Sequence, residues 1–348
     1  MKVLIYRLGS LGDTVIALPV FHLIARTFPN AERYLLGSVS IANQKTCHPQ
    51  MVLAGTGLVH GYLEYPVGLR DLCALGELRD KIRLLSPDIL IYLAEARGLL
   101  KTYRDILFFR LCGVRRMIGV PYTTALQQPR WFTEKECFEY EAERLARCVS
   151  KIGDARLNDR SSWDLHLSPM ELGRIQEILN PVTAKQPIIA ASLGTKVDVK
   201  HWGRTNWECL FEKLGRQYSN YALVFIGAKS EYAECERAGE CWQGKKLNLC
   251  GLLSPRESAA ALQKASLFIG HDTGPMHLAA SVGTSCIAIF SARNKPGVWF
   301  PYGNNHRVIY HQTPCYGCRL EICESHAKKC ITSITVEEVE NAVHALLQ

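Results

Sequence analysis

The sequence lacks the features of membrane-spanning and secreted chains. None of its apolar runs reaches the roughly 18–20 residues that a helix needs to cross a bilayer. The opening MKVLIYRLGSLGD has only four apolar residues before Arg7, too few for the apolar core of a signal peptide. Low-complexity tracts and internal repeats of about 20–50 residues are also absent, which argues against a disordered chain or a solenoid. We therefore expect a globular, cytoplasmic protein.

Three common signatures of nucleotide enzymes are missing as well. The chain has neither the dinucleotide motif G-x-G-x-x-G at a strand–helix turn nor a phosphate-binding loop that ends in Gly-Lys-Ser/Thr. These absences weigh against nicotinamide and ATP chemistry. No Asp-x-Asp occurs either, so no obvious carboxylate pair is available for a magnesium-bridged diphosphate.

What is present describes a large folded chain with an uneven charge. The 348 residues, 47% hydrophobic and 21% charged, can bury the cores of roughly two domains. The net charge is +8, and residues 1–133 hold almost all of it (16 basic and 9 acidic side chains). This excess suggests an anionic partner: nucleic acid, a membrane surface or a phosphorylated glycan. The alternative is a plain surplus of arginine with no partner.

Short apolar runs alternate with helical patterns along the chain, as in parallel sheets covered on both faces. The expected strands are Val3–Tyr6, Glu32–Gly37, Asp88–Glu95, Ile188–Ser192, Tyr221–Ala228, Ala265–Asp272 and Ser285–Ala292. Two prolines between Asn180 and Pro187 indicate a linker. We predict two doubly wound α/β domains, residues 1–180 and 181–348, with a cleft between them. The final helix, Val336–Leu347, has one apolar face and could pack back on the first domain.

The first expected strand runs into a glycine loop with the spacing G-x-x-G. Gly9 and Gly12 allow a sharp bend and a close approach of a ligand to the backbone. Asp13 follows where a helix should begin, so it is either the N-cap of that helix or a carboxylate that faces the ligand. In the second role it could take a proton from an attacking hydroxyl group.

A second strand–helix turn lies in the C-terminal half. Asp272 and Thr273 follow an apolar strand, and the helix after them begins with Gly274 and a proline and contains His277. The free N–H groups of such a helix start suit a diphosphate.

Two further loops add candidates to this half. Thr195 and Lys200 follow the strand Ile188–Ser192, where a hydroxyl and an ammonium group could contact phosphate oxygens. Glu231, after the next strand, could accept hydrogen bonds from ribose hydroxyls or could be a solvated carboxylate at a helix start.

The RLGSLGD opening, the KHW element at Lys200–Trp202 and the segment HDTGPMHLAA resemble glycosyltransferase family 9, the lipopolysaccharide heptosyltransferases. The resemblance extends over nearly the whole chain. It implies the GT-B fold, in which two Rossmann-like domains face each other. The first domain would bind the acceptor and the second the nucleotide sugar.

The resemblance also implies a role for each matching position. Asp13 would be the general base that deprotonates the acceptor hydroxyl. The donor-binding residues would be Thr195 and Lys200 on the diphosphate, Glu231 on the ribose, and Asp272, Thr273, Gly274 and His277 on the sugar and phosphates. The implied reaction is an inverting transfer without metal or other cofactor, and the resemblance favours transfer of heptose from ADP-heptose to a lipopolysaccharide core-type acceptor at the cytoplasmic face of the inner membrane. The alternatives are another nucleotide sugar for a different surface glycan, or a non-catalytic protein that binds a sugar nucleotide or a metal.

Three basic residues follow the strand Asp88–Glu95 at helical spacing. Arg97, Lys101 and Arg104 would share one helix face and could meet the phosphates of a glycolipid acceptor, or could form an ordinary solvated face. Aromatic residues are not interleaved with these charges in a stacking pattern, so we expect no nucleic-acid partner.

The tail of the chain concentrates four of the 14 cysteines. Cys315, Cys318, Cys323 and Cys330 have the spacing C-x2-C-x4-C-x6-C. Four thiolates could ligate Zn²⁺ or an iron–sulfur cluster, could pair as disulfides, or could remain free thiols. The other cysteines are scattered singly, as buried thiols are in a reducing compartment.

Overall fold

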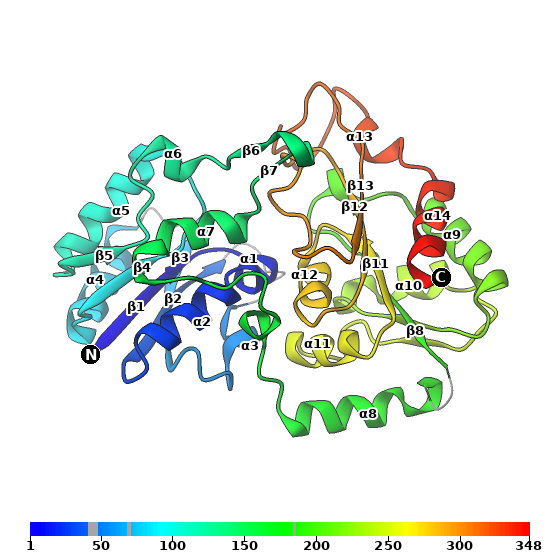
Figure 1. The fold of residues 1–348 in the computed structure, drawn as a ribbon, viewed down its shortest axis with the longest axis horizontal. Coiled ribbons are helices and arrows are strands. Elements are labelled where there is room, and N and C mark those ends of the chain that lie inside the picture. The colour runs from blue at the N-terminus through cyan, green and yellow to red at the C-terminus, as the bar shows by residue number, and fades with distance from the viewer. Residues whose placement is uncertain (41–47, 68–70, 184–185) are drawn as a thin grey trace. The chain divides into compact units, whose positions relative to one another are not determined.

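A computed structural model describes residues 1–40, 48–67, 71–183 and 186–348, and it divides the chain into two compact units. Unit 1 is Met1–His166 and unit 2 is Leu167–Gln348. Each unit contains a parallel sheet with helices packed along it (Figure 1). No helix among the described residues is long and apolar enough to span a bilayer.

Unit 1 has a five-stranded parallel sheet in the order β3-β2-β1-β4-β5. Its strands are β1 (Lys2–Arg7), β2 (Glu32–Ser40), β3 (Gly61–Val67), β4 (Ile89–Tyr92) and β5 (Arg116–Ile118), with a separate antiparallel pair, β6 (Trp131–Phe132) and β7 (Cys137–Phe138). Its α-helices are α1 (Leu11–Ile16), α2 (Leu18–Thr27), α3 (Gln50–Leu53), α4 (Leu72–Leu85), α5 (Leu99–Leu111), α6 (Thr124–Gln127) and α7 (Glu141–Val149). The central strands β1 and β4 are buried almost throughout, as the continuous apolar runs predicted.

Unit 2 has a six-stranded parallel sheet in the order β10-β9-β8-β11-β12-β13. Its strands are β8 (Ile188–Ser192), β9 (Ala222–Phe225), β10 (Lys246–Asn248), β11 (Leu267–His271), β12 (Cys286–Phe290) and β13 (His306–Tyr310). Its α-helices are α8 (Pro169–Thr183), α9 (Arg204–Gln217), α10 (Tyr232–Ala238), α11 (Pro255–Gln263), α12 (Gly274–Ser281), α13 (Lys329–Thr332) and α14 (Val336–Leu347). All seven predicted strands are present, and each lies in one of the two parallel sheets.

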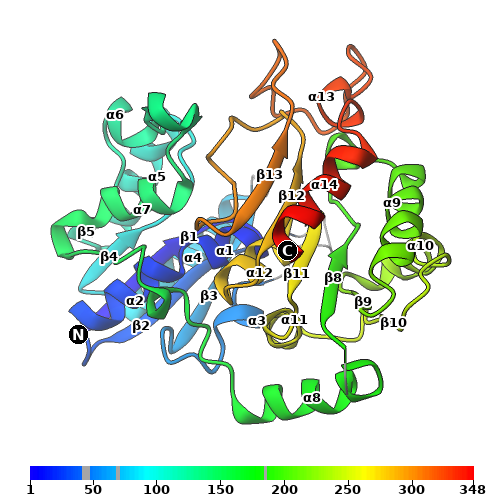
Figure 2. The same cartoon turned by 45° about the vertical axis from the view of Figure 1, so that its right-hand side comes forward.

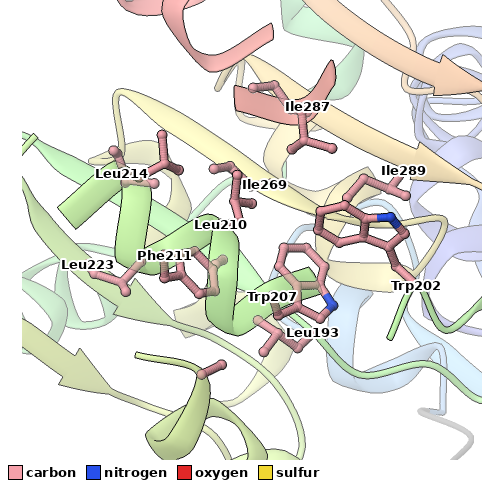
Figure 3. Packing of buried hydrophobic residues seen from close by; sticks show 14 of the residues in the cluster. Leu193, Trp202, Trp207, Leu210, Phe211, Leu214, Leu223, Ile269, Ile287 and Ile289 are labelled. Carbon is pink, nitrogen blue, oxygen red and sulfur yellow. The ribbon is translucent and has the colours of Figure 1, made fainter. Parts of the chain in front are cut away.

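The core of unit 2 forms where α9 packs on the sheet. Trp207, Leu210, Phe211 and Leu214 are fully buried at helical spacing on one face of α9 (Figure 3). Trp202 lies edge-on to Trp207, with ring centroids 5.1 Å apart, and its indole N–H donates to the Ile334 carbonyl at 2.8 Å. This packing fixes the segment that follows Lys200, one of the predicted site residues.

The predicted linker differs from the structure. Helix α8 continues through Asn180 and Pro181 to Thr183, so a linker is wrong for residues 180–183, while residues 184–185 of the predicted linker lie outside the described part of the chain. The helix is held within unit 2, where Glu171 binds Arg256 and Arg174 binds Glu257 of α11. The units divide instead at Leu167.

The final helix spans the predicted residues and packs on the sheet of unit 2. Val339 and Val343 are buried, and α14 packs against α9, β12 and β13. Its N-terminus has a capping box in which Thr335 and Glu338 bond to each other's backbone N–H groups.

Candidate functional site

The glycine loop of unit 1 joins β1 to α1 and presents Asp13. The N-cap of α1 is Ser10, so an N-cap at Asp13 itself is wrong. Asp13 is the third residue of α1, and its side chain bonds back to the N-cap residue. Its Oδ2 accepts from the Ser10 N–H at 2.6 Å and from the Ser10 hydroxyl at 2.8 Å. The side chain keeps 18% of its surface exposed, so the carboxylate is both held in place and accessible.

Gly9 makes this arrangement possible. Its φ is +142°, and a Cβ atom at this position would lie 2.4 Å from the Cβ atom of Asp13. Gly9 is also tied to β2, because its N–H donates to the Ser38 hydroxyl at 3.0 Å. Gly12 lies buried in the first turn of α1. Of the two predicted loop glycines, Gly9 is therefore the one whose lack of a side chain leaves room for Asp13.

A buried network of charges lies behind Asp13. Arg7 is fully buried and donates to the Asp13 carbonyl at 2.7 and 3.1 Å and to the Leu93 carbonyl at 2.6 Å. Its guanidinium lies 3.6 Å from Asp13 Oδ1 and 3.7 Å from Glu141 Oε1. Glu141 in turn accepts two hydrogen bonds of 2.7 Å from Arg144. Burial opposes the charge of Arg144, but the Glu141 carboxylate outweighs it and raises the pKa of this guanidinium.

This network was not predicted from the sequence. Arg7 was visible only as part of the glycine loop, and Glu141 and Arg144 lie far from it in the chain. The available signal was the i, i+3 spacing of Glu141 and Arg144 at a helix start, which is common on solvated helices and points to no partner.

In unit 2 the candidate residues gather at the carboxyl ends of parallel strands. Lys200 follows β8, and Asp272 follows the neighbouring strand β11. The Lys200 Nζ lies 2.6 Å from Asp272 Oδ2 and donates to the Asp272 carbonyl at 2.9 Å. Both side chains are mostly buried. The structure therefore joins two of the predicted donor-binding residues that are far apart in the chain.

Asp272 is the centre of this cluster. Asn294, which was not predicted, donates to Asp272 Oδ2 at 3.1 Å, and His277 Nε2 lies 3.9 Å from Asp272 Oδ1. Thr273 is the N-cap of α12 and Gly274 is its first residue. The cluster therefore stands at the positive end of a helix dipole.

His271, one residue earlier, connects this turn to the KHW element. It is fully buried, and its Nε2 accepts from the Trp202 N–H at 3.1 Å. Burial lowers the pKa of His271 to about 3, so the ring is neutral at physiological pH and can accept this bond. The bond fixes the backbone two residues after Lys200.

Glu231 lies against two glycines. A Cβ atom at Gly194 would come within 1.9 Å of its carboxyl carbon, and one at Gly227 within 2.1 Å of its Oε2. Oε2 accepts from the Ala228 N–H at 3.1 Å. The neighbouring Thr195 turns its hydroxyl to the Val197 carbonyl at 2.9 Å. Both glycines are therefore required by the position of the Glu231 carboxylate.

The three basic residues near α5 do not share one face, so that expectation is wrong. Arg97 precedes the helix and turns inward, where it donates to the Tyr6 hydroxyl at 3.1 Å and to the buried carboxylate of Asp105. Gly98, with φ +93°, separates it from α5. Lys101 and Arg104 lie on α5 and are exposed, although Arg104 also pairs with Asp105 at 2.9 Å.

The four tail cysteines line one cavity of about 580 Å³ together with Val199, Arg293, Thr313 and Lys328. Cys315, Cys318 and Cys323 lie between β13 and α13, in loops that extend beyond the end of β13 (Figure 2), and Cys330 lies in α13. The thirteen cysteines of the described part of the chain, these four included, are free thiols. Among the described residues no three His, Cys, Asp or Glu side chains are arranged to hold a metal ion.

Two Rossmann-like units, each with a loop or turn of candidate residues at the carboxyl ends of its strands, have the architecture of a GT-B glycosyltransferase. A family model described as glycosyltransferase family 9 (heptosyltransferase) matches residues 110–329. The chain belongs to this family and is a glycosyltransferase.

Individual relatives agree with this assignment. Lipopolysaccharide heptosyltransferase 1 of Pseudomonas aeruginosa is 24% identical over 335 residues, which cover 93% of this chain and 87% of that protein. The solved structure of a family 9 glycosyl transferase from Veillonella parvula has a TM-score of 0.74 at 18% identity and covers 99% of this chain and 97% of that one. The E. coli heptosyltransferase WaaC, solved with ADP-2-deoxy-2-fluoro heptose, has a TM-score of 0.65 at 16% identity, with 99% of each chain covered. The family and fold predicted from the sequence are confirmed.

Proposed function

We propose that this chain transfers heptose from ADP-heptose to a lipopolysaccharide core-type acceptor, with inversion at the anomeric carbon. The cluster of Lys200 and Asp272 at the start of α12 is the observation that carries this proposal. The named relatives support the choice of sugar, because one is a lipopolysaccharide heptosyltransferase and another was solved with an ADP-heptose analogue. Unit 1 binds the acceptor, and unit 2 binds the donor.

Asp13 acts as the general base. As the acceptor hydroxyl attacks the anomeric carbon, its proton passes to the Asp13 carboxylate, and the bond from that carbon to the diphosphate oxygen breaks. Ser10 occupies Oδ2, which leaves Oδ1 to take the proton. The buried Arg7 guanidinium lies 3.6 Å from Oδ1 and holds this oxygen on the side of the loop away from Ser10.

Lys200 and the start of α12 stabilise the leaving diphosphate. An ammonium group has three donors, and Asp272 engages Lys200 through two acceptors, so one N–H remains for a phosphate oxygen. The free N–H groups of the first turn of α12 add further donors with a positive dipole end. These groups supply the electrostatic stabilisation that a metal ion provides in other transferases.

Glu231, Thr195 and the residues at the start of α12 make the remaining contacts with the donor. Glu231 accepts hydrogen bonds from the ribose hydroxyls, and the neighbouring Gly194 allows the nucleoside to approach the backbone. When the donor is bound, the Thr195 hydroxyl exchanges its bond to the Val197 carbonyl for one to a phosphate oxygen. Asp272, Thr273, Gly274 and His277 hold the sugar and phosphates.

The acceptor is a phosphorylated glycolipid at the cytoplasmic face of the inner membrane. The basic excess of residues 1–133 supports an anionic acceptor. Of the three predicted cations, Lys101 and Arg104 are exposed and can contact the acceptor. Arg97 points into unit 1, where it binds Tyr6 and Asp105.

A donor screen tests the reaction. The purified chain is given a panel of nucleotide sugars with a core-type acceptor, and release of nucleoside diphosphate is measured. We expect ADP-heptose to give the highest kcat/KM. A higher value for another nucleotide sugar would assign the scaffold to a different surface glycan, and no turnover with any donor would leave a non-catalytic binding protein.

Two variants test the residue roles. Asp13→Asn should lower kcat by about 10²–10⁴ while the donor KM stays unchanged, because only the base is lost. Lys200→Met should weaken ADP binding and lower kcat. Lys213→Met is its matched control, since Lys213 also pairs with a carboxylate of unit 2, that of Glu340 at 2.9 Å. An Asp13→Asn enzyme of normal kcat would remove the general base from the proposal.

A further inference from the structure

Helix α5 carries large apolar side chains on its outer, exposed side. Thr102, Asp105 and Phe109 face the interior of unit 1. On the other side, large apolar side chains are exposed at helical spacing: 89% at Leu100, 53% at Tyr103, 61% at Leu107 and 57% at Leu111. Figure 1 shows α5 at the rim of its unit. Single exposed apolar residues are normal on protein surfaces, but an aligned row of four on one helix is a feature that needs a partner.

Neighbouring segments extend this row into a patch. Leu84, 87% exposed, is the second-last residue of α4, and the adjacent Arg83 donates to the Leu111 carbonyl at 3.2 Å. At the other end, the Tyr103 hydroxyl donates to the carbonyl of Tyr122, whose side chain is 49% exposed. We call this surface the α5 patch; it consists of Leu84, Leu100, Tyr103, Leu107, Leu111 and Tyr122.

The exposed charges of α5 have one sign. Lys101, Arg104 and Arg110 are the exposed charged residues of α5, and they are interleaved with its apolar row. The single acidic residue of the helix, Asp105, is buried and binds Tyr92 as well as Arg104. Apolar side chains among cations are the composition that binds the interface of an anionic bilayer, where leucines enter the acyl boundary and cations meet the headgroups.

The same charges argue against other occupants. In a symmetric dimer formed through this surface, the cations of one copy would face the identical cations of the other. A nucleic acid would satisfy the cations but would leave the leucines without an apolar partner. An anionic bilayer complements both parts of the patch.

We propose that the α5 patch docks unit 1 on an anionic lipid bilayer. The apolar row enters the interface, and Lys101 and Arg110 contact the lipid headgroups. The proposal deepens the proposed function, on which it rests in one respect: a membrane-embedded glycolipid acceptor gives the docking its purpose. Docking concentrates the enzyme on the surface that holds the acceptor.

Vesicle co-sedimentation of the full chain tests this proposal. We expect binding to vesicles that contain phosphatidylglycerol, weak binding to pure phosphatidylcholine vesicles, and a loss of binding at high salt. The double variant Leu100→Ser/Leu107→Ser should lower the affinity by about tenfold or more, because it removes the centre of the apolar row. The matched control is Met170→Ser/Leu252→Ser in unit 2, where the side chains are 81% and 60% exposed and no row is formed.

The outcomes separate this inference from the proposed function. The Leu100→Ser/Leu107→Ser variant should keep the wild-type rate on a delipidated, soluble acceptor and lose rate only on vesicle-borne acceptor. Vesicle binding equal to that of the wild type would overturn the proposal. So would a patch-dependent dimer in solution that shows no vesicle binding. If the wild type turns over no donor but its vesicle binding still depends on the patch, the proposed function fails and the docking surface stands.

Discussion

Glu141→Gln is the substitution that tests most directly how unit 1 holds Asp13. The change keeps the size of the side chain and removes its charge. Glu141 is 3% exposed and lies between two guanidinium groups, bonded twice to Arg144 and 3.7 Å from Arg7. The variant therefore leaves two buried cations with one carboxylate fewer.

The magnitude follows from that burial. Removing one partner of a buried ion pair costs about 3–5 kcal/mol, and the amide of glutamine can still accept one hydrogen bond from Arg144, so we expect a value near the lower end. For a unit of this size, 1 kcal/mol corresponds to roughly 2–4 °C in Tm, which predicts a fall of about 6–12 °C. We also expect kcat to fall with little change in donor KM, because Arg7 holds both the backbone and the carboxylate of Asp13.

Glu139→Gln is the matched control. Glu139 is also buried and accepts two hydrogen bonds from Arg147, at 2.9 and 2.7 Å, but this pair does not contact Arg7. Thermal unfolding and steady-state transfer are measured for both variants. Both should lose stability, and only Glu141→Gln should lose kcat beyond the loss of folded protein. Equal kcat values in the two variants would refute a role of the network in placing Asp13, and an unchanged Tm for Glu141→Gln would refute the burial argument itself.

Three further predictions concern the glycine loop and unit 2. Gly9→Ala should lower both Tm and kcat, because its Cβ atom would lie 2.4 Å from that of Asp13; Gly113→Ala, at φ +90° but in open space, controls for backbone strain alone. A bond from Arg256 lowers the pKa of Glu171 to about 2, so its contribution to stability is complete above about pH 4.5 and is lost as the pH falls toward 2; Glu171→Gln should remove this part of the pH dependence of Tm. Burial lowers the pKa of His271 to about 3, so its contribution is complete above pH 6.5 and declines as the pH falls toward 3, and Tm of His271→Gln should vary less with pH over that range. A Tm profile with the slope of the wild type would contradict either pH prediction.

The parts of the fold that the sequence predicted are those set by local patterns. Continuous apolar runs predicted the buried central strands, and the single apolar face of Val336–Leu347 predicted α14 to the residue. Edge strands such as β10 and β13 were missed because their exposed sides break the apolar run. The linker failed for another reason: Pro181 is tolerated near the end of α8, because tertiary contacts to α11 hold the helix.

The candidate site, too, was predicted only where local sequence patterns define it. Lys200 and Asp272 were found separately, each by its place after a strand, because the carboxyl ends of parallel strands meet at one edge of a sheet. Their direct pairing, and the third partner Asn294, depend on distances between loops that no local pattern encodes. The inward turn of Arg97 likewise depends on Asp105, whose burial could not be deduced from its neighbours.

The positions of the basic side chains in the structure change how the charge excess of residues 1–133 is interpreted. Arg7 and Arg33 are buried, and Arg33 donates to the carbonyls of four residues, so these two cations bind together the interior of unit 1 and attract no ligand. A part of the +7 therefore never reaches the surface, and the net charge alone overstates the field that a partner meets. On α5, in contrast, the exposed cations Lys101 and Arg110 lie beside exposed leucines. If the attraction to anionic membranes came from net charge alone, Lys2→Glu, at the partly exposed amino end of β1, would weaken vesicle binding as much as Lys101→Glu. Since binding requires apolar contact at the same place, Lys101→Glu should weaken vesicle binding more than Lys2→Glu.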